Sequence, residues 1–262
     1  IYFGNRNWHP LLIDTVRQMA MDGVERALTF VTSAYSSYSG CRQYLENLEE
    51  ACRVVGEAAP VFDKLRVFYN HPRFIEANVD HVKEAWVSLP DFVRDQAILL
   101  GTAHSIPLAM AETCCYESQL EETVCLIGEG ADINQMDLVY QSRSGPPEQP
   151  WLGPDVCDFL EGLPGKGIPA VVLAPIGFLS DHMEVLFDLD REARDLCNEV
   201  GLSIVRAKTV GTHPAYIRMI RELIQERIMG EPQDRVAMGR HASSHDVCPR
   251  ICCSYAPARS TS

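Results

Sequence analysis

Three acidic residues lie four positions apart in the segment that follows PIGFLSDHM: Glu184, Asp188 and Glu192. On an α-helix, residues at this spacing lie about 6 Å apart along the axis, and each is turned by about 40° from the last. A local π-helical widening would bring the carboxylates closer to one line. Such a row can pass a divalent cation along or carry protons away. A solvated acidic helix face is the commoner alternative, although apolar neighbours such as Val185 and Leu189 surround the row. Both interpretations stay open on the pattern alone.

A single histidine, His104, ends the apolar run ILLGTAH and is followed by SIP. A lone histidine after a strand is more often structural than catalytic. A neutral imidazole paired with a carboxylate, however, suits a borderline divalent metal and can accept a proton from an N–H group. Because His104 and Glu184 both follow predicted strands, they are candidates to face one cleft at the carboxyl edge of a sheet.

The elements that position these residues alternate between short β-branched runs and amphipathic segments of helical period. This alternation predicts an α/β fold of parallel sheets with helices on both faces. Strands are predicted at residues 27–33, 64–69, 97–103, 137–142, 170–174 and 203–208. Helices are predicted at residues 11–21, 45–55, 73–87, 119–129, 156–163, 184–200 and 214–229.

The composition narrows the class of protein. With a net charge of −13 and a pI near 5.0, the chain is a poor candidate for a nucleic-acid partner. No cluster of five basic residues, no run of 18 apolar residues and no signal-peptide pattern is present. We therefore expect a cytoplasmic enzyme without stable membrane insertion, with a monomer as the favoured state.

Three segments, in this order and spacing, resemble the signature segments of ferrochelatases: TAHSIP, YQSRSGPPEQPWLGPDV and PIGFLSDHMEVLFDLDREA. The resemblance extends upstream through GNRNWHP, FVTSAYSSYSGCRQY and NHPRF, and covers roughly residues 1–229. It implies an enzyme of haem biosynthesis that inserts Fe²⁺, its substrate, into a porphyrin. It also implies two doubly wound, Rossmann-like domains of the chelatase type, with the porphyrin in the cleft between them.

The resemblance assigns roles to the residues already singled out. His104 matches the histidine of the family's H-S-I/L-P motif, and Glu184 matches the glutamate of its D-H-x-E motif. These two are expected to face each other across the porphyrin centre, to bind iron and to deprotonate the pyrroles. Asp188 and Glu192 match the acidic row that leads a cation or protons to and from that centre.

Two aromatic residues are predicted to contact or support the porphyrin. Tyr44, in CRQY, resembles a tyrosine that touches the porphyrin in bacterial members, although an ordinary amphipathic-helix position explains it equally well. Trp151, in PWLGP, is expected to support the wall of the site rather than to take part in the chemistry.

The resemblance divides the chain into four parts. Residues 1–90 are expected to be the C-terminal part of a first, incomplete α/β domain, and residues 91–210 a second. Residues 211–230 are expected to form a helix that packs back on the first domain, ahead of a cysteine-containing tail at residues 231–262. The opening IYFGNRNWHP suggests a strand already in progress. We therefore expect the natural N-terminus to lie upstream of Ile1, and this chain alone to be inactive.

Four of the ten cysteines do not lie in apolar periodic segments: Cys41, Cys248, Cys252 and Cys253. Some ferrochelatases bind a 2Fe–2S cluster through one internal cysteine and three in a C-terminal tail, and the resemblance implies this ligand set. Four thiolates is the number required. The adjacent pair in CPRICC departs from the usual spacing, so zinc and an unliganded reactive tail remain alternatives.

The substrate and the class of protein each have alternatives. The GNRNW and SAYSSYSGC segments resemble the coproporphyrin III branch of the family, and protoporphyrin IX is the other candidate substrate. A non-catalytic porphyrin- or haem-binding module that senses redox state through its cysteines would need no acidic row. A cobalt or nickel chelatase for another tetrapyrrole would share the fold but not the QSRSGPPEQPWLGPDV loop.

Overall fold

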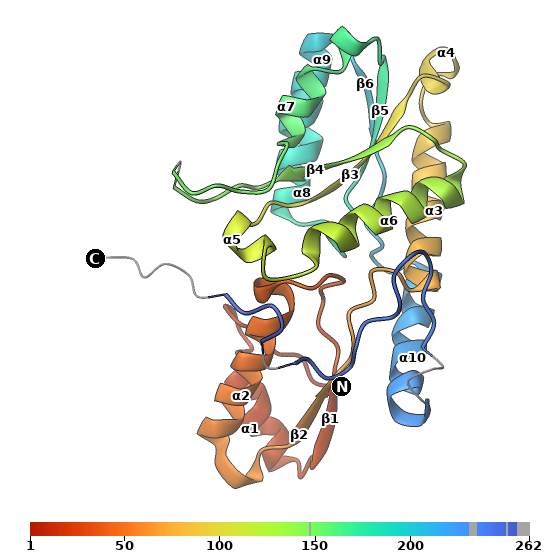
Figure 1. Ribbon diagram of the computed structural model, residues 1–262. Helices are drawn as coiled ribbons and strands as arrows, with labels where there is room; N and C mark the ends of the chain where they lie inside the picture. Colours follow the sequence, from red (N-terminus) through yellow and green to blue (C-terminus); the bar gives the residue numbers. More distant parts are fainter. Residues whose placement is uncertain (147, 231–234, 250, 256–262) are drawn as a thin grey trace.

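Two parallel sheets organise the chain, whose computed structural model describes residues 1–146, 148–230, 235–249 and 251–255 (Figure 1). A four-stranded sheet has the order β4-β3-β5-β6, and a two-stranded sheet pairs β1 with β2. The strands are β1 (Arg26–Thr29), β2 (Val61–Lys64), β3 (Ile98–His104), β4 (Met136–Gln141), β5 (Ala170–Ala174) and β6 (Ser203–Arg206). The predicted α/β class with parallel sheets is confirmed.

Helices fill most of the connections between the strands. The α-helices are α1 (Leu12–Met21), α2 (Gln43–Val55), α3 (Pro72–Val87), α4 (Asp91–Arg94), α5 (Leu108–Ala111), α6 (Tyr116–Ala131), α7 (Val156–Glu161), α8 (Met183–Phe187), α9 (Arg194–Val200) and α10 (Pro214–Met229). Two π-helical segments, η1 (Tyr38–Arg42) and η4 (Asp188–Ala193), directly precede α2 and α9. Short 3₁₀ turns lie at η2 (Gly56–Ala58) and η3 (Pro164–Lys166). Among the described residues, no helix has the length and apolar character needed to cross a membrane.

One predicted strand is misplaced. The strand predicted at residues 64–69 is instead β2, Val61–Lys64, and residues 65–69 are buried without regular structure. The partner strand β1 ends at Thr29, which pairs with Lys64, so the ladder has no partner beyond that point. The apolar run that suggested a strand reflects burial rather than pairing, because Phe68 is packed in the core.

The four-stranded sheet buries alternate residues on opposite faces. Ile98 and Leu100 of β3 pack on the face covered by α7 and α9, whereas Leu99 and Ala103 pack on the face covered by α3 and α6. This alternation follows from the two-residue side-chain period of a strand. His104 has the same parity as Ile98 and Leu100. Its position in the strand therefore turns it toward the face that α7, α8 and α9 cover.

The strand order reverses between β3 and β5. The chain runs from β3 to β4 on one side and then crosses back to β5 and β6 on the other. Because right-handed crossovers in opposite directions place their helices on opposite faces, α6 covers one face and α8 to α9 the other. Such a reversal is the topological switch point of a doubly wound sheet, outside which ligands bind.

Contacts cross the predicted boundary near residues 89–91. The long helix α3 packs against α6 and against α10, and its apolar face joins the core that contains Leu99 and Val172 of the four-stranded sheet. Helix α10 is also tied to the segment after β2, since buried Arg66 forms an ion pair with Glu226 at 2.7 Å. Figure 1 shows α10 alongside the lower end of α3.

The described part of the tail is attached to the body of the molecule. Arg66 donates a hydrogen bond to the carbonyl of Val236 at 2.9 Å, and Asn70 donates to the carbonyl of His241 at 3.0 Å. The carboxylate of Glu122, on α6, is 2% exposed and forms an ion pair with Arg240 at 2.9 Å. These contacts hold the described part of the tail against the body of the molecule, on a path toward η1, which carries Cys41.

Candidate functional site

His104 occupies the last position of β3, at the strand-order reversal. It is half-buried, and its backbone carbonyl accepts a hydrogen bond from the hydroxyl of Tyr116 at 3.0 Å. The following residue, Ser105, is buried and donates its hydroxyl hydrogen bond to the carbonyl of Leu152 at 2.7 Å. These contacts fix the backbone on both sides of the imidazole.

The ring of His104 has a defined tautomer. Its Nδ1 lies 2.5 Å from the carbonyl oxygen of Ser105. A carbonyl oxygen only accepts, so Nδ1 must carry the hydrogen, and the lone pair of a neutral ring then lies on Nε2. Nε2 is therefore the atom that can accept a proton or bind a metal ion.

The acidic row lies on the helical segment that follows β5. Glu184 lies in the first turn of α8, Asp188 begins the π-helical segment η4, and Glu192 lies within it. Glu184 and Glu192 are exposed and Asp188 is half-buried. The π-helical widening that would bring the row closer to one line is therefore present. Segments of this kind recur at functional sites.

The end of β4 holds the middle carboxylate of the row. Asp188 Oδ2 accepts hydrogen bonds from Gln141 Nε2 at 3.1 Å and from the Ser142 hydroxyl at 2.5 Å. Gln141 Nε2 also lies 3.1 Å from the backbone carbonyl of Glu184. Ser142 has φ 61°, a left-handed conformation that costs a non-glycine residue about 1 kcal/mol or more and that clusters at active sites.

Gln141 also connects the row to His104. The two residues are register partners on the adjacent strands β3 and β4. Register partners project from the same face of a sheet, and for Gln141 that face is the one on which Val139 packs against α7 and α8 to α9. The β3–β4 register and the buried amide of Gln141 therefore bring His104 and the backbone of Glu184 to one corner of the sheet. Sequence analysis did not single out Gln141 or Ser142, although both lie in the QSRSG segment.

An arginine on β6 orients the loop that leads to Glu184. The guanidinium of Arg206, 13% exposed, forms ion pairs with Asp181 at 3.2 Å and with Asp190 at 2.8 Å. Asp181 lies before α8, and Asp190 lies within η4. The single guanidinium of Arg206 therefore joins the loop that precedes Glu184 to the π-helical segment that carries Asp188 and Glu192. Sequence analysis missed Arg206, because nothing near it in the sequence marks its partners.

A further carboxylate, Asp155, lies near the acidic row at the start of α7. Its side chain accepts from the backbone N–H of Cys157 at 2.9 Å, and so caps the helix. Burial raises the pKa of Asp155, and the charges of Asp158 and Asp188 raise it further. Burial, followed by Asp155 and Glu192, raises the pKa of the Cys157 thiol to about 11. Asp155, Asp158, Asp188 and Glu192 therefore place several carboxylates close together on this side of the site.

Trp151 connects the long loop after β4 to the segment after β3. It forms an antiparallel bridge with Pro107, and the flanking backbone bonds join Leu108 to Pro150 and Leu152 to Ile106 at 3.0 Å each. A side chain at Gly145 would overlap the Trp151 ring, so the ring packs directly on the loop backbone. This geometry agrees with a supporting position in the wall of the site.

Tyr44 lies on α2, an element that carries neither His104 nor the acidic row. It is half-buried in the first turn of α2, and the guanidinium of Arg6 stacks over its ring at 4.9 Å. No hydrogen bond among the described residues connects Tyr44 with His104 or Glu184. Its role in porphyrin binding stays a prediction.

The four selected cysteines converge at η1. A side-chain hydrogen bond with Cys41 lowers the pKa of Cys248, and the same bond raises that of Cys41. Cys252 Sγ lies 3.7 Å from Cys253 Sγ and 3.8 Å from Nε2 of His245. The ligand atoms of His245, Cys248 and Cys252 all lie within 4.8 Å of one another. Sequence analysis did not single out His245.

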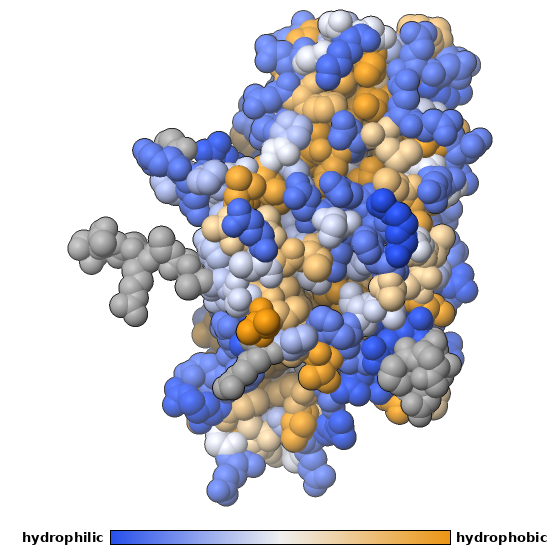
Figure 2. Space-filling view, viewed as in Figure 1, coloured by the Kyte–Doolittle hydropathy of each residue, from blue (hydrophilic) through white to orange (hydrophobic). Residues whose placement is uncertain are grey.

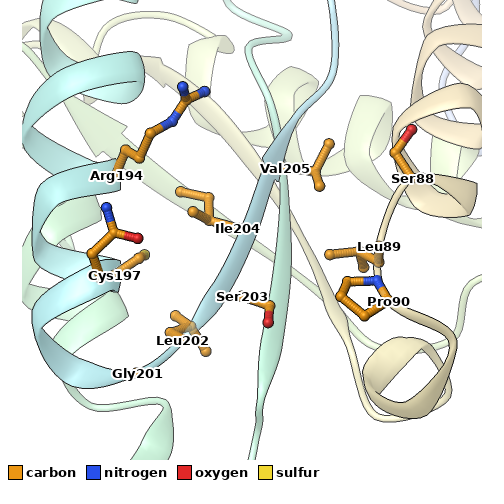
Figure 3. Close-up of a pocket in the computed structure, with 11 residues that line it drawn as sticks. Ser88, Leu89, Pro90, Arg194, Cys197, Gly201, Leu202, Ser203, Ile204 and Val205 are labelled. Carbon is orange, nitrogen blue, oxygen red and sulfur yellow. The ribbon is translucent and has the colours of Figure 1, made fainter.

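A pocket of about 550 Å³ lies at the opposite end of the four-stranded sheet. It is lined by the start of β6, by Arg194 and Cys197 of α9, and by residues 88–90, which precede β3 (Figure 3). Figure 2 shows hydrophobic residues in this upper region, over β5 and β6. The amino ends of parallel strands rarely carry the chemistry of a doubly wound fold, so this pocket is not the candidate active site.

Comparisons with known proteins agree with this geometry. The ferrochelatase family model matches residues 1–228. The chain is 50% identical over 260 residues to a ferrochelatase from Rhodopirellula baltica, with 99% of this chain and 74% of the relative covered. It is 48% identical over 238 residues to a coproporphyrin III ferrochelatase from Nocardia farcinica, with 88% and 68% covered.

A solved structure shows the same fold at low identity. SirB from Bacillus subtilis, solved with Fe³⁺, superimposes with a TM-score of 0.54 at 12% identity and covers 84% of this chain and 80% of its own. This match shows a shared chelatase fold alone. The family match and the close relatives do not favour the non-catalytic binding module. The chain belongs to the ferrochelatase family, the porphyrin chelatases that insert Fe²⁺ in haem biosynthesis.

Proposed function

We propose that Fe²⁺ insertion by this protein takes place at the corner of the four-stranded sheet formed by His104 and the Glu184–Asp188–Glu192 row. The observation that carries the proposal is Gln141, the register partner of His104, whose amide reaches both the Glu184 backbone and the Asp188 carboxylate. An imidazole and a set of carboxylates at one corner supply a proton acceptor and oxygen ligands for the substrate ion.

His104 is the proposed proton acceptor. Insertion of Fe²⁺ requires the loss of two pyrrole N–H protons, and a neutral imidazole accepts protons near neutral pH. The contact of Nδ1 with the Ser105 carbonyl leaves Nε2 as the accepting atom. The acidic row then offers oxygen atoms onto which a proton can pass toward solvent, because Glu184 and Glu192 are exposed.

The carboxylates are the proposed carriers of Fe²⁺. Exposed carboxylates hold a divalent ion transiently, and the ion must leave them for the porphyrin nitrogens. Asp188 is the fixed member of the row, because Gln141 and Ser142 hold it. Replacement by Asp188→Asn is expected to raise KM for Fe²⁺ and leave KM for porphyrin within about twofold. An unchanged KM for Fe²⁺ would remove Asp188 from the path.

We propose coproporphyrin III as the preferred porphyrin. The support is that relatives from Nocardia farcinica and Streptomyces griseus, 48% and 45% identical to this chain, are named coproporphyrin III ferrochelatases. The test is Fe²⁺ insertion by the full-length gene product with coproporphyrin III and protoporphyrin IX in parallel. A kcat/KM at least tenfold higher for coproporphyrin III is expected. A preference for protoporphyrin IX would overturn the assignment, and binding without turnover would restore the binding-module alternative.

We also propose a 2Fe–2S cluster where the tail meets η1. The residues fit such a group, because Cys41, Cys248, Cys252 and Cys253 converge there. Buried Lys64 adds a compensating positive charge. Its field opposes the rise in the pKa of Cys41 that Cys248 and burial cause, and adds to the lowering of the pKa of Cys248 by Cys41. A 2Fe–2S cluster carries one electron at a time. The chain supplies thiolate ligands, the buried cation, and a tail path set by Arg66, Asn70 and Glu122.

Iron and acid-labile sulfide analysis tests the cluster. We expect a reddish-brown full-length protein with two irons and two sulfides per chain. A colourless protein without iron or sulfide would overturn the proposed cluster. One equivalent of zinc in place of the iron and sulfide would assign the site to zinc. The cytoplasmic location and the monomeric state stay predictions.

A further inference from the structure

Two buried tyrosines donate hydrogen bonds to the backbone just where β3 and β5 end. The hydroxyl of Tyr116, the first residue of α6, donates to the carbonyl of His104 at 3.0 Å. The hydroxyl of Tyr35 donates at 3.1 Å to the carbonyl of Ile176, which lies two residues after the end of β5. Ile176 belongs to the turn that leads toward α8 and Glu184. Each tyrosine therefore holds the backbone that leads into one half of the proposed site.

The side chains of Tyr35 and Tyr116 also contact each other. Their ring centroids lie 6.0 Å apart with an interplanar angle of 81°, the edge-to-face arrangement that aromatic pairs prefer. Tyr35 is 2% exposed and Tyr116 is 7% exposed. Burial raises the pKa of both hydroxyls, so both stay protonated and can donate throughout the working range of pH. One packed contact therefore links the two backbone bonds.

The turn that Tyr35 holds packs directly on β3. The N–H of Gly177 donates to the carbonyl of Thr102 at 3.0 Å. A Cβ at Gly177 would lie only 2.7 Å from the Cα of Ala103, so this close approach requires glycine. Ala103 directly precedes His104, and a shift of the turn therefore changes its placement relative to the imidazole.

Tyr35 comes from the segment that follows β1, in the other sheet of the molecule. The next residue, Ser36, is bound to α6 by Gln119, whose Oε1 accepts from the Ser36 N–H at 2.7 Å and whose Nε2 donates to the Ser36 hydroxyl at 3.0 Å. Gln119 is buried and lies one turn after Tyr116. Helix α6 therefore holds both tyrosines, and the pair joins the segment after β1 to the edge of the four-stranded sheet.

We propose that Tyr116 and Tyr35 are positioning residues for metal insertion, Tyr116 for the imidazole of His104 and Tyr35 for the turn that leads to Glu184. This inference rests on the site proposed above and names what sets the placement of its two halves. Both hydroxyls bind backbone carbonyls, so they act through the residues that they hold. Loss of either bond lets one half of the site move relative to the other, which lowers the rate of insertion rather than the affinity for substrates.

The test is steady-state Fe²⁺ insertion by the full-length gene product, with the variants Tyr116→Phe and Tyr35→Phe and the control Tyr140→Phe. Tyr140 is a buried tyrosine of β4 whose hydroxyl has no hydrogen-bond partner in the described part of the chain, so its removal breaks no bond. Tyr116→Phe and Tyr35→Phe are each expected to lose about 3- to 10-fold in kcat, the size of one neutral hydrogen bond. KM for porphyrin and KM for Fe²⁺ are expected to stay within about twofold, and the control is expected to keep the wild-type kcat.

The same assay includes His104→Ala and Glu184→Ala, which separates this inference from the proposed site. If those two variants lose turnover while Tyr116→Phe or Tyr35→Phe keeps kcat within about twofold of wild type, that tyrosine has no positioning role and the site stands. Full turnover by His104→Ala or Glu184→Ala would overturn the site itself. An equal loss of kcat in Tyr140→Phe would assign the effect to packing and overturn the inference. Phenylalanine keeps the ring contact, so all three variants are expected to fold, and urea unfolding checks this.

Discussion

The side-chain amide of Gln141 donates a hydrogen bond of 3.1 Å to the carboxylate of Asp188, and so joins the end of β4 to the helix that carries the acidic row. Gln141 is 1% exposed, and its other bond, to the Glu184 carbonyl, holds the first member of that row by its backbone. Because Gln141 is also the register partner of His104, its amide ties the acidic row to the strand next to His104.

Replacement of Gln141 by leucine is expected to slow Fe²⁺ insertion without abolishing porphyrin binding. A hydrogen bond to a charged group contributes about 1.5–3 kcal/mol, which corresponds to about a 10- to 100-fold loss of kcat if the bond positions the row. KM for porphyrin is expected to change by less than about threefold. Gln96→Leu, an exposed glutamine before β3, is the control. Equal rates for the two variants would show that Gln141 has no positioning role.

Loss of Arg206 is expected to destabilise the fold far more than loss of its exposed neighbour Arg194. Arg206 is 13% exposed and pairs with both Asp181 and Asp190, so Arg206→Met leaves Asp181 without its cation and Asp190 with only its contact to exposed Arg194 at 3.4 Å. Breaking a fully buried pair costs about 3 kcal/mol, and the partial exposure of Asp181 and Asp190 lowers the expected cost here to about 2 kcal/mol. Arg194→Met removes an exposed contact to Asp190 and is expected to cost less than about 1 kcal/mol. Urea unfolding at pH 7.5 measures the free energy of unfolding of both variants. Similar losses for Arg206→Met and Arg194→Met would contradict the stabilising role of Arg206.

Buried His71 is expected to make the protein sensitive to acid. Burial, with the positive charges of Arg66 and Arg73, lowers the pKa of His71 to about 3, whereas an unfolded histidine titrates near 6.5. As pH falls below 6.5, the His71 imidazole therefore binds a proton in the unfolded chain but stays neutral in the folded protein, and the free energy of unfolding falls. The stability contribution is present above pH 6.5 and is lost progressively down to about pH 3. Between pH 7.5 and 4.5 the loss is about 2–3 kcal/mol.

The matched variant for this effect is His71→Asn. His71 caps α3 by accepting from the N–H of Arg73, and asparagine retains a capping oxygen but does not titrate. Unfolding free energies of wild type and variant at the two pH values isolate the histidine from all other groups. The wild type is expected to lose about 2–3 kcal/mol more than the variant on acidification. Parallel losses would show that His71 does not remain neutral in the fold.

The tail is expected to detach when Gly239 is replaced by alanine. Gly239 has φ 81°, and a Cβ there would collide with the Glu122 carboxylate, which holds Arg240. Gly167→Ala is the control, because Gly167 has φ 77° with open space around it and thus tests the backbone cost alone. Tryptic cleavage of the tail is expected to be about tenfold faster or more in Gly239→Ala than in Gly167→Ala. Equal cleavage rates would mean that Glu122 does not hold the tail.

The local sequence pattern predicted the strands that are buried on both faces and the helices that bury one continuous apolar stripe. Strand β5 was predicted with its observed limits, because all five residues are apolar and buried. The strand predicted at residues 64–69 was wrong, because strand length depends on the distant partner β1, which ends at Thr29. The sequence did not predict the π-helical segment η4, although such a widening brings the acidic row closer to one line.

Long-range contacts in the site could not be predicted in the same way. The bond from Gln141 to Asp188 spans 47 positions, and no local period reports it. Arg206 and Asp181 lie 25 positions apart on different elements. His245 approaches Cys252 only when the tail folds back along Arg66, Asn70 and Glu122. The resemblance to a family supplied the roles of His104 and Glu184, whereas the supports around them came from the structure.

The central claim is that His104 and Glu184 together carry out metal insertion, and one measurement tests it most directly. Multiple-turnover Fe²⁺ insertion is compared for wild-type full-length protein, His104→Ala, Glu184→Ala and the exposed control Glu199→Ala, with porphyrin binding measured in parallel. We predict that both site variants bind porphyrin but lose about 10²- to 10⁴-fold in kcat, and that the control keeps the wild-type rate. Turnover within about threefold of wild type by either site variant would contradict the account.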